Sequence, residues 1–97
     1  MSPTYALSGE ADRDIDEILR FTKARWGLRQ AERYGGELHA TFDLLAGAPE
    51  IGKRIDHIRA GYRRFEHRSH SIYYVTTAGG VTIMRVLHGR MLSTGRL

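Results

Sequence analysis

The sequence predicts an α+β domain, in which an N-terminal strand and an antiparallel helical hairpin precede a three-stranded antiparallel meander in the order β-α-α-β-β-β. Two observations lead to this fold class. Apolar residues recur every three or four positions in the first half of the chain, as they do on one face of a helix. After Pro49 the period shortens to two, which is typical of strands.

Composition limits the kind of protein. The 97 residues suffice for one domain, and we expect residues 1–97 to form it. The absence of cysteine excludes disulfides, thiolate nucleophiles and cysteine-type zinc sites, and it fits a cytoplasmic protein. No apolar run is long enough to span a membrane, so no membrane partner is expected. The net charge of +4 makes acidic proteins and nucleic acids candidate partners.

Both predicted helices have recognisable ends. A short apolar strand at residues 5–7 stops at Ser8, a good N-cap, and Gly27 ends the helix that follows. The second helix begins almost at once and stops at Gly47 and Pro49. The core-facing positions expected on the first helix are Ala11, Ile15, Ile18, Leu19, Thr22 and Trp26. Those expected on the second helix are Ala31, Tyr34, Leu38, Phe42 and Leu45.

The second half of the chain contains a polar strand and a hairpin. Residues 58–67 alternate but are polar, which predicts a less buried strand. Residues 71–88 flank Gly79-Gly80 with β-branched and aromatic side chains, and a two-residue turn there sets Ala78 opposite Val81. The face expected to pack under the helices then holds Tyr73, Val75, Met84 and Val86. The face expected to stay open for a partner holds Ile72, Tyr74, Ile83, Arg85 and Leu87.

Several kinds of site find little support in the sequence. His67 and His70 are the closest histidine pair, but no carboxylate stands at a convincing ligand spacing, so no metal is expected. No phosphate-binding loop is present, and we expect no cofactor. Ser69, His70 and Ser71 are sequence neighbours, which a strand sends to opposite faces, and this argues against a hydrolytic site.

Basic side chains are more informative. The guanidinium group matches carboxylate and phosphate alike, so arginines on a structured sheet are candidates for binding an acidic peptide or a nucleic acid. The basic group comprises Arg63, Arg64, Arg68, Arg85, Arg90, His67 and His88. Arg63 and Arg85 are the favoured members, because alternation places both among apolar residues of the sheet.

Four stretches of the chain, taken in order, resemble a known family. They are "YALSGEADRDIDEILRFTKARWG", "QAERYGGELHATFDLLAGAPEIGK", "YRRFEHRSHSIYYV" and "VTIMRVLHGRM". Together they are similar to the ParE branch of the ParE/RelE toxin superfamily, from about residue 5 to residue 91. The resemblance implies a plasmid-stabilisation type of toxin that inhibits DNA gyrase. It also implies a ParD-like antitoxin, which would neutralise the toxin in a hetero-oligomeric complex.

The expected partner-binding residues combine this resemblance with the open face of the sheet. They are Arg63, Ile72, Tyr74, Ile83, Arg85, Leu87, His88, Arg90 and Met91. For gyrase, the resemblance points to the C-terminal residues 88–97.

Two other functions stay open. A RelE-like, ribosome-dependent mRNA endonuclease would use His88 as a general base and Arg85 or Arg90 to hold phosphate. However, Ser71 stands where RelE carries an arginine, and no tyrosine follows His88, which weakens this alternative. The third possibility is a module that binds its antitoxin and has lost toxicity.

Overall fold

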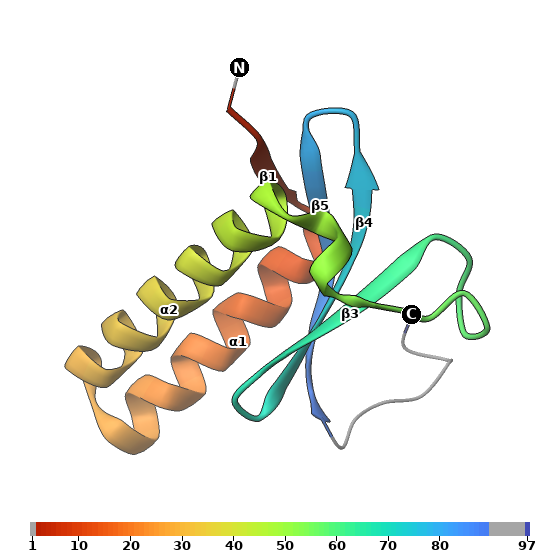
Figure 1. Cartoon of the computed structure of the whole chain (residues 1–97). Coiled ribbons are helices and arrows are strands. Elements are labelled where there is room, and N and C mark those ends of the chain that lie inside the picture. The colour runs from red at the N-terminus through yellow and green to blue at the C-terminus, as the bar shows by residue number, and fades with distance from the viewer. Residues whose placement is uncertain (1, 90–96) are drawn as a thin grey trace.

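A five-stranded sheet with two helices on one face forms the molecule (Figure 1). The computed structural model describes residues 2–89 and residue 97. The strands lie in the order β1-β5-β4-β3-β2, with β1 parallel to β5 and the other neighbours antiparallel. The elements are β1 (Thr4–Leu7), α1 (Gly9–Trp26), α2 (Leu28–Gly47), the 3-10 helix η1 (Pro49–Ile51), β2 (Lys53–Arg54), β3 (Tyr62–His67), β4 (His70–Thr77) and β5 (Gly80–His88).

The predicted order β-α-α-β-β-β is confirmed, with the short β2 as an additional strand. Ser8 caps α1 as expected, since its hydroxyl accepts a hydrogen bond from the Ala11 amide at 3.0 Å. Gly27 ends α1 with φ of 97°, a conformation that glycine adopts at little cost. None of the helices in the described residues is long and apolar enough to cross a membrane.

The main core lies between the helices and the sheet. Most of the predicted helix positions reach it, but Trp26 does not, because its side chain is 66% exposed. A smaller apolar cluster lies on the helix-free face of the sheet and is built around Ile55, Tyr62, Tyr73 and Leu87. The buried members of the main core are Ala11, Tyr34, Leu38, Phe42, Leu45, Ala46, Ile72, Tyr74, Val81, Ile83 and Val86.

The predicted turn of the β4–β5 hairpin is wrong by one residue, which shifts the strand pairings next to it by two, so that Val75 pairs with Thr82 rather than Met84. Thr77 pairs with Gly80, so Ala78 and Gly79 form the turn. Gly80 is a strand residue whose backbone passes close to β1, and a Cβ there would lie 1.9 Å from the Thr4 carbonyl oxygen. The chain therefore needs a glycine in the strand at this point rather than in the turn.

A β-bulge then changes which residues at the end of β5 share a face. Tyr74 pairs with Ile83 and Tyr73 pairs with Arg85, which leaves Met84 as an extra residue. Because of the bulge, Val86 lies on the same face as Ile83, three positions earlier. Ile72, Tyr74 and Ile83 lie under the helices, whereas Tyr73, Val75 and Met84 face the opposite side. The predicted grouping of these six residues into two faces is confirmed, but the group that faces the helices is the opposite one, while Val86 packs in the main core as expected.

Candidate functional site

A groove between α1 and the C-terminal end of β5 is lined by several of the predicted site residues. Its volume is about 410 Å³. One wall comes from α1 and the other from the last residues of β5, with His70 at the start of β4 beside them. The lining residues are Asp14, Glu17, Ile18, Phe21, His70, Arg85, Val86, Leu87 and His88.

Arg85 is tied to the α1 wall of this groove. Its guanidinium donates to Asp14 through Nε at 2.7 Å and through Nη2 at 2.9 Å, and Glu10 lies 3.4 Å from Nη1. The same Asp14 carboxylate accepts the Val86 backbone amide at 3.0 Å. The hydrogen bonds to Asp14 raise the pKa of Arg85 above its ordinary value, and they hold the guanidinium group in place. The sequence did not reveal this pairing, because Asp14 and Arg85 are far apart along the chain.

An aromatic and histidine cluster forms the end of the groove. The rings of His70 and His88 lie 5.9 Å apart, and the Tyr34 hydroxyl is 2.7 Å from Nδ1 of His70. Burial, followed by the nearby His88 and His67, lowers the pKa of His70. Burial also raises the pKa of Tyr34 to about 12. Both groups are therefore neutral near pH 7, and the pair is a hydrogen-bonded structural contact rather than a charged one.

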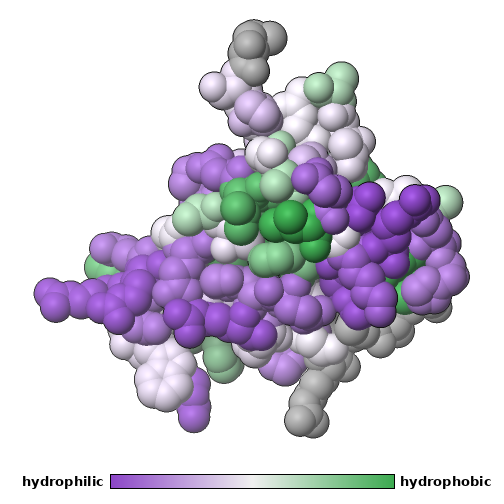
Figure 2. All heavy atoms as spheres, viewed as in Figure 1, coloured by the Kyte–Doolittle hydropathy of each residue, from purple (hydrophilic) through white to green (hydrophobic). Residues whose placement is uncertain are grey.

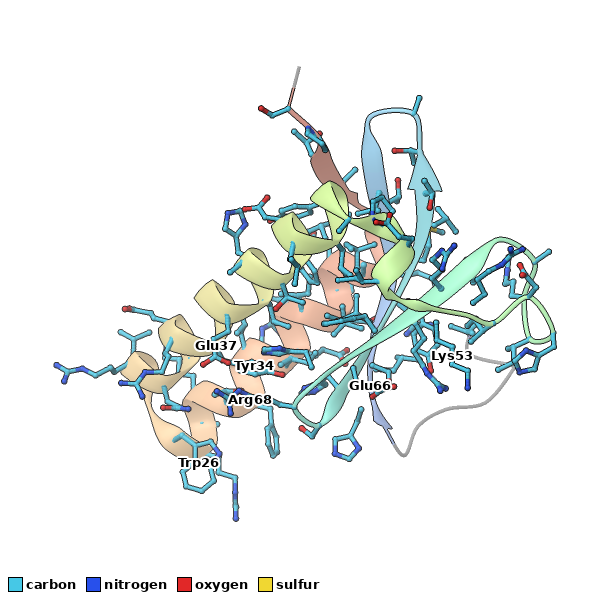
Figure 3. The ribbon with its side chains drawn as sticks, in the orientation of Figure 1. Trp26, Tyr34, Glu37, Lys53, Glu66 and Arg68 are labelled. Carbon is cyan, nitrogen blue, oxygen red and sulfur yellow. The ribbon has the colours of Figure 1, made fainter. Side chains whose placement is uncertain are left out.

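The β3–β4 turn is fastened to α2 next to this cluster. Arg68 has φ of 54° and donates to both carboxylate oxygens of Glu37, at 2.6 and 3.0 Å. His67 lies 3.3 Å from the same carboxylate. Figure 3 shows Tyr34, Glu37 and Arg68 close together between α2 and the turn. This contact fixes the start of β4 and with it His70.

Exposed apolar side chains extend the groove toward the tip of the helical hairpin. Phe21 is 67% exposed and also lines a second hollow of about 220 Å³, together with Trp26, Tyr34 and Arg68. Trp26 points away from the molecule at the hairpin tip (Figure 3). Large exposed apolar groups beside a groove are typical of a protein-binding surface. Sequence reasoning missed Phe21, whose only signal was an aromatic residue outside the core-facing positions of the helix.

A separate apolar patch lies over the C-terminal end of α2 and η1 (Figure 2). Leu44 and Ile51 are exposed there by 52% and 44%. This patch holds none of the sequence-predicted site residues.

The predicted partner-binding residues separate into several groups. Arg85, Leu87 and His88 meet at the groove. Ile72, Tyr74 and Ile83 are fully buried under the helices, where a partner does not reach them. Arg63 lies elsewhere, on β3, and donates to the Gly52 carbonyl at 2.8 Å. Arg90 and Met91 lie outside the described residues.

The groove offers little chemistry for a metal. Among residues 2–89 and 97, no group of three histidine, aspartate or glutamate side chains could hold a metal ion. What the groove offers is a fixed cation, the neutral His70 and exposed apolar side chains, which suit the binding of a polypeptide.

Comparison with known proteins identifies the family. The chain matches the family model described as "ParE toxin of type II toxin-antitoxin system, parDE" over residues 5–93. It is 45% identical to Toxin ParE1 of Mycobacterium tuberculosis, with 94% of each chain covered. It is 40% identical to Toxin ParE1 of Caulobacter vibrioides, with 96% of each chain covered.

A solved structure described as "Chromosomal ParDE TA system from P. aeruginosa" has the same fold. Its TM-score is 0.73 at 16% identity, and the match covers 89% of this chain and 95% of that chain. The family match and the two ParE1 relatives span nearly all of the sequence. The chain therefore belongs to the ParE toxin family of type II toxin-antitoxin systems.

Proposed function

We propose that this protein inhibits DNA gyrase and is neutralised by a ParD-like antitoxin, with which it forms a complex in the cytoplasm. The observation that carries the proposal is the likeness to two ParE1 toxins at 40–45% identity over nearly the whole chain. Inhibition by binding requires no catalytic group of its own, and the described groove is suited to binding.

The groove supports this function over RNA cleavage. A nuclease of the RelE kind needs a cation directed at the scissile phosphate and a base for the attacking 2′-hydroxyl. Arg85 instead points at α1 and gives two guanidinium nitrogens to Asp14. To hold a phosphate, it would first have to leave a short, mostly buried ion pair.

In the proposed complex, a segment of the antitoxin covers the groove. Phe21 is the natural anchor, because it is large, apolar and mostly exposed at the meeting point of the two hollows. A segment that buries Phe21 and binds only the folded toxin also stabilises the toxin by mass action. Buried aromatic anchors commonly dominate such interfaces.

The toxic activity is tested by a gyrase supercoiling assay with purified protein, run with and without the ParD-like protein. Inhibition that the ParD-like protein relieves is the expected result, and messenger RNA in a translating extract should stay intact. Unimpaired supercoiling by folded toxin, with cleaved messenger RNA, would favour the nuclease instead. Growth that continues on induced expression of the toxin alone would indicate a module without toxicity.

The groove is tested by Phe21→Ala. We expect the affinity for the ParD-like protein to fall about tenfold or more, since truncating an aromatic anchor commonly costs at least about 1.4 kcal/mol. Leu44→Ala is the matched control, because Leu44 is also an exposed apolar residue but lies on the separate patch. Equal affinities for the two variants would contradict the assignment of the groove.

A further inference from the structure

The β2–β3 hairpin, residues 53–64, concentrates positive charge at one edge of the sheet. It carries five lysines and arginines, and Asp56 is its one acidic residue. In Figure 2, hydrophilic side chains cover this side of the molecule. The five cations are Lys53, Arg54, Arg59, Arg63 and Arg64.

The register sets like charges directly opposite each other. Lys53 pairs with Arg64, and Arg54 pairs with Arg63. Like charges in opposing positions of a sheet destabilise it, because their side chains are the closest cross-strand neighbours. Two such pairs in succession leave a positive potential that a partner of opposite charge would relieve.

The carboxylates nearby offset only part of this charge. Arg54 is 2.8 Å from Asp56, and Arg64 is 3.1 Å from Glu66, but the side chains of Arg54 and Glu66 are more than half exposed, so these pairs contribute little. Arg63 donates to backbone carbonyl groups instead. Within the part of the chain that the structure describes, Lys53 has no ion pair, and it is exposed beside β3 (Figure 3).

The hairpin is held in one shape. Ile55 and Tyr62 are 1% and 7% exposed and anchor the connecting loop in the cluster on the helix-free face. The Asp56 carboxylate accepts the Gly61 amide at 2.8 Å, and this hydrogen bond is the main cause of its lowered pKa. A rigid hairpin loses little conformational entropy when a partner binds.

The cations occupy both faces of the ribbon. Arg64 pairs with Tyr73, on the helix-free side, whereas Arg63 pairs with Tyr74, which points under the helices. Lys53 lies on the same face as Arg64, and Arg54 on the same face as Arg63, because directly paired residues share a face. An acidic peptide laid on one face would reach only half of these charges. Duplex DNA carries phosphate groups on both sides of each groove, so its backbones can reach cations on both faces of this sheet edge.

We propose that the β2–β3 hairpin binds duplex DNA through its phosphate backbones, without reading the base sequence. In the cell, we expect the hairpin to bind the DNA segment that gyrase holds, and this part of the inference rests on the proposed function. DNA binding by the toxin alone does not depend on gyrase, and the two proposals can therefore fail separately.

The experiment measures the binding of purified toxin to a short fluorescent DNA duplex at several salt concentrations. Wild-type affinity should fall steeply with salt, since each neutralised phosphate adds about 0.9 to the slope of log K against log salt. In the double variant Lys53→Gln/Arg54→Gln, the slope should drop by about 1.8 and the affinity at about 0.1 M salt by about tenfold or more. Both residues are exposed, so the melting temperature should not fall appreciably.

The matched control is Lys23→Gln/Arg29→Gln, which removes the same charge from two exposed residues at the tip of the helical hairpin. Its slope should stay within about 0.5 of the wild-type value. Equal losses in both double variants would overturn the proposal, because they would indicate net charge alone. So would the absence of duplex binding, or tighter binding of a poly-glutamate peptide than of the duplex. Gyrase inhibition without any effect of the hairpin substitutions on DNA binding would leave the proposed function standing and remove this inference.

Discussion

The ion pair between Asp14 and Arg85 should be a main link between α1 and β5. Asp14 receives two guanidinium hydrogen bonds and the Val86 amide, and the exposed fractions of the Asp14 and Arg85 side chains are 12% and 17%. Asp14→Ala removes all three acceptor contacts and leaves the cation with Glu10 at 3.4 Å. A lost hydrogen bond to a charged group costs about 1.5–3 kcal/mol, and breaking a fully buried pair about 3–5 kcal/mol.

Because both side chains keep some contact with water, we expect a loss of about 2–3 kcal/mol in the free energy of unfolding. For a domain of this size, that loss lowers the melting temperature by roughly 10–20 °C. The assay is urea unfolding of the wild type, Asp14→Ala, Arg85→Ala and the double variant. Their double-mutant cycle should give a coupling energy of at least about 1.5 kcal/mol.

The control is the pair of Arg20 and Asp16 on α1, which has a similar distance of 2.8 Å but exposed fractions of 78% and 60%. Its coupling energy should be about 0.3–0.5 kcal/mol. If the cycle on Asp14 and Arg85 gives no more than this, the pair does not link α1 to β5 and the reasoning is refuted.

Three further predictions concern stability. Gly80→Ala should lower the free energy of unfolding by about 2 kcal/mol or more, since the new Cβ would collide with the Thr4 carbonyl oxygen. Gly79→Ala is the control and should not lower it, because a Cβ there meets nothing within 4 Å. Similar urea midpoints for the two variants would contradict this. Because the pKa of His70 is lowered by burial and by His88 and His67, the unfolded chain takes up the proton first, so stability should fall as the pH drops below about 6.5. His70→Gln should weaken that pH dependence in urea titrations at several pH values, and an unchanged dependence would assign it to other groups. Lys53→Glu, which places a carboxylate opposite Arg64, should raise the free energy of unfolding by about 0.2–1 kcal/mol, and a measured loss would argue against repulsion in the hairpin.

Local signals predicted the helices well. Ser8 and Gly27 determine the ends of α1 through their own side-chain and backbone chemistry, so the sequence near them is sufficient. Gly35 and Gly36 did not interrupt α2. A Cβ at Gly35 would meet Leu19 of α1 at 3.5 Å, so this position allows the two helices to lie close together.

Long-range contacts account for what the sequence did not predict. The turn of the β4–β5 hairpin shifted by one residue because Gly80 must pass β1, a strand more than 70 residues earlier in the chain. The bulge at Met84 then places Val86 on the helix side, where its backbone amide donates to Asp14. Neither contact has a local signature. The turn shift leaves the predicted groups of residues on each face unchanged, whereas the bulge moves Val86 to the face of Ile83.

The residues of the candidate site were only partly predictable from the sequence. Leu87 and His88 were placed near the groove by their position at the end of the strand. Phe21 was missed because an aromatic residue on the exposed side of a helix is not distinguished by periodicity from an ordinary surface residue. Only the adjoining hollows give Phe21 a role.

The most direct test of the proposed gyrase inhibition is whether the purified toxin poisons gyrase, that is, traps the enzyme on broken DNA. Plasmid, gyrase and ATP are incubated with the toxin, the protein is denatured with detergent, and linear plasmid is measured on a gel. We predict linear DNA that increases with toxin concentration and disappears when the ParD-like protein is added first. Plasmid that stays fully closed at every concentration of folded, growth-arresting toxin would contradict gyrase poisoning as its mode of action.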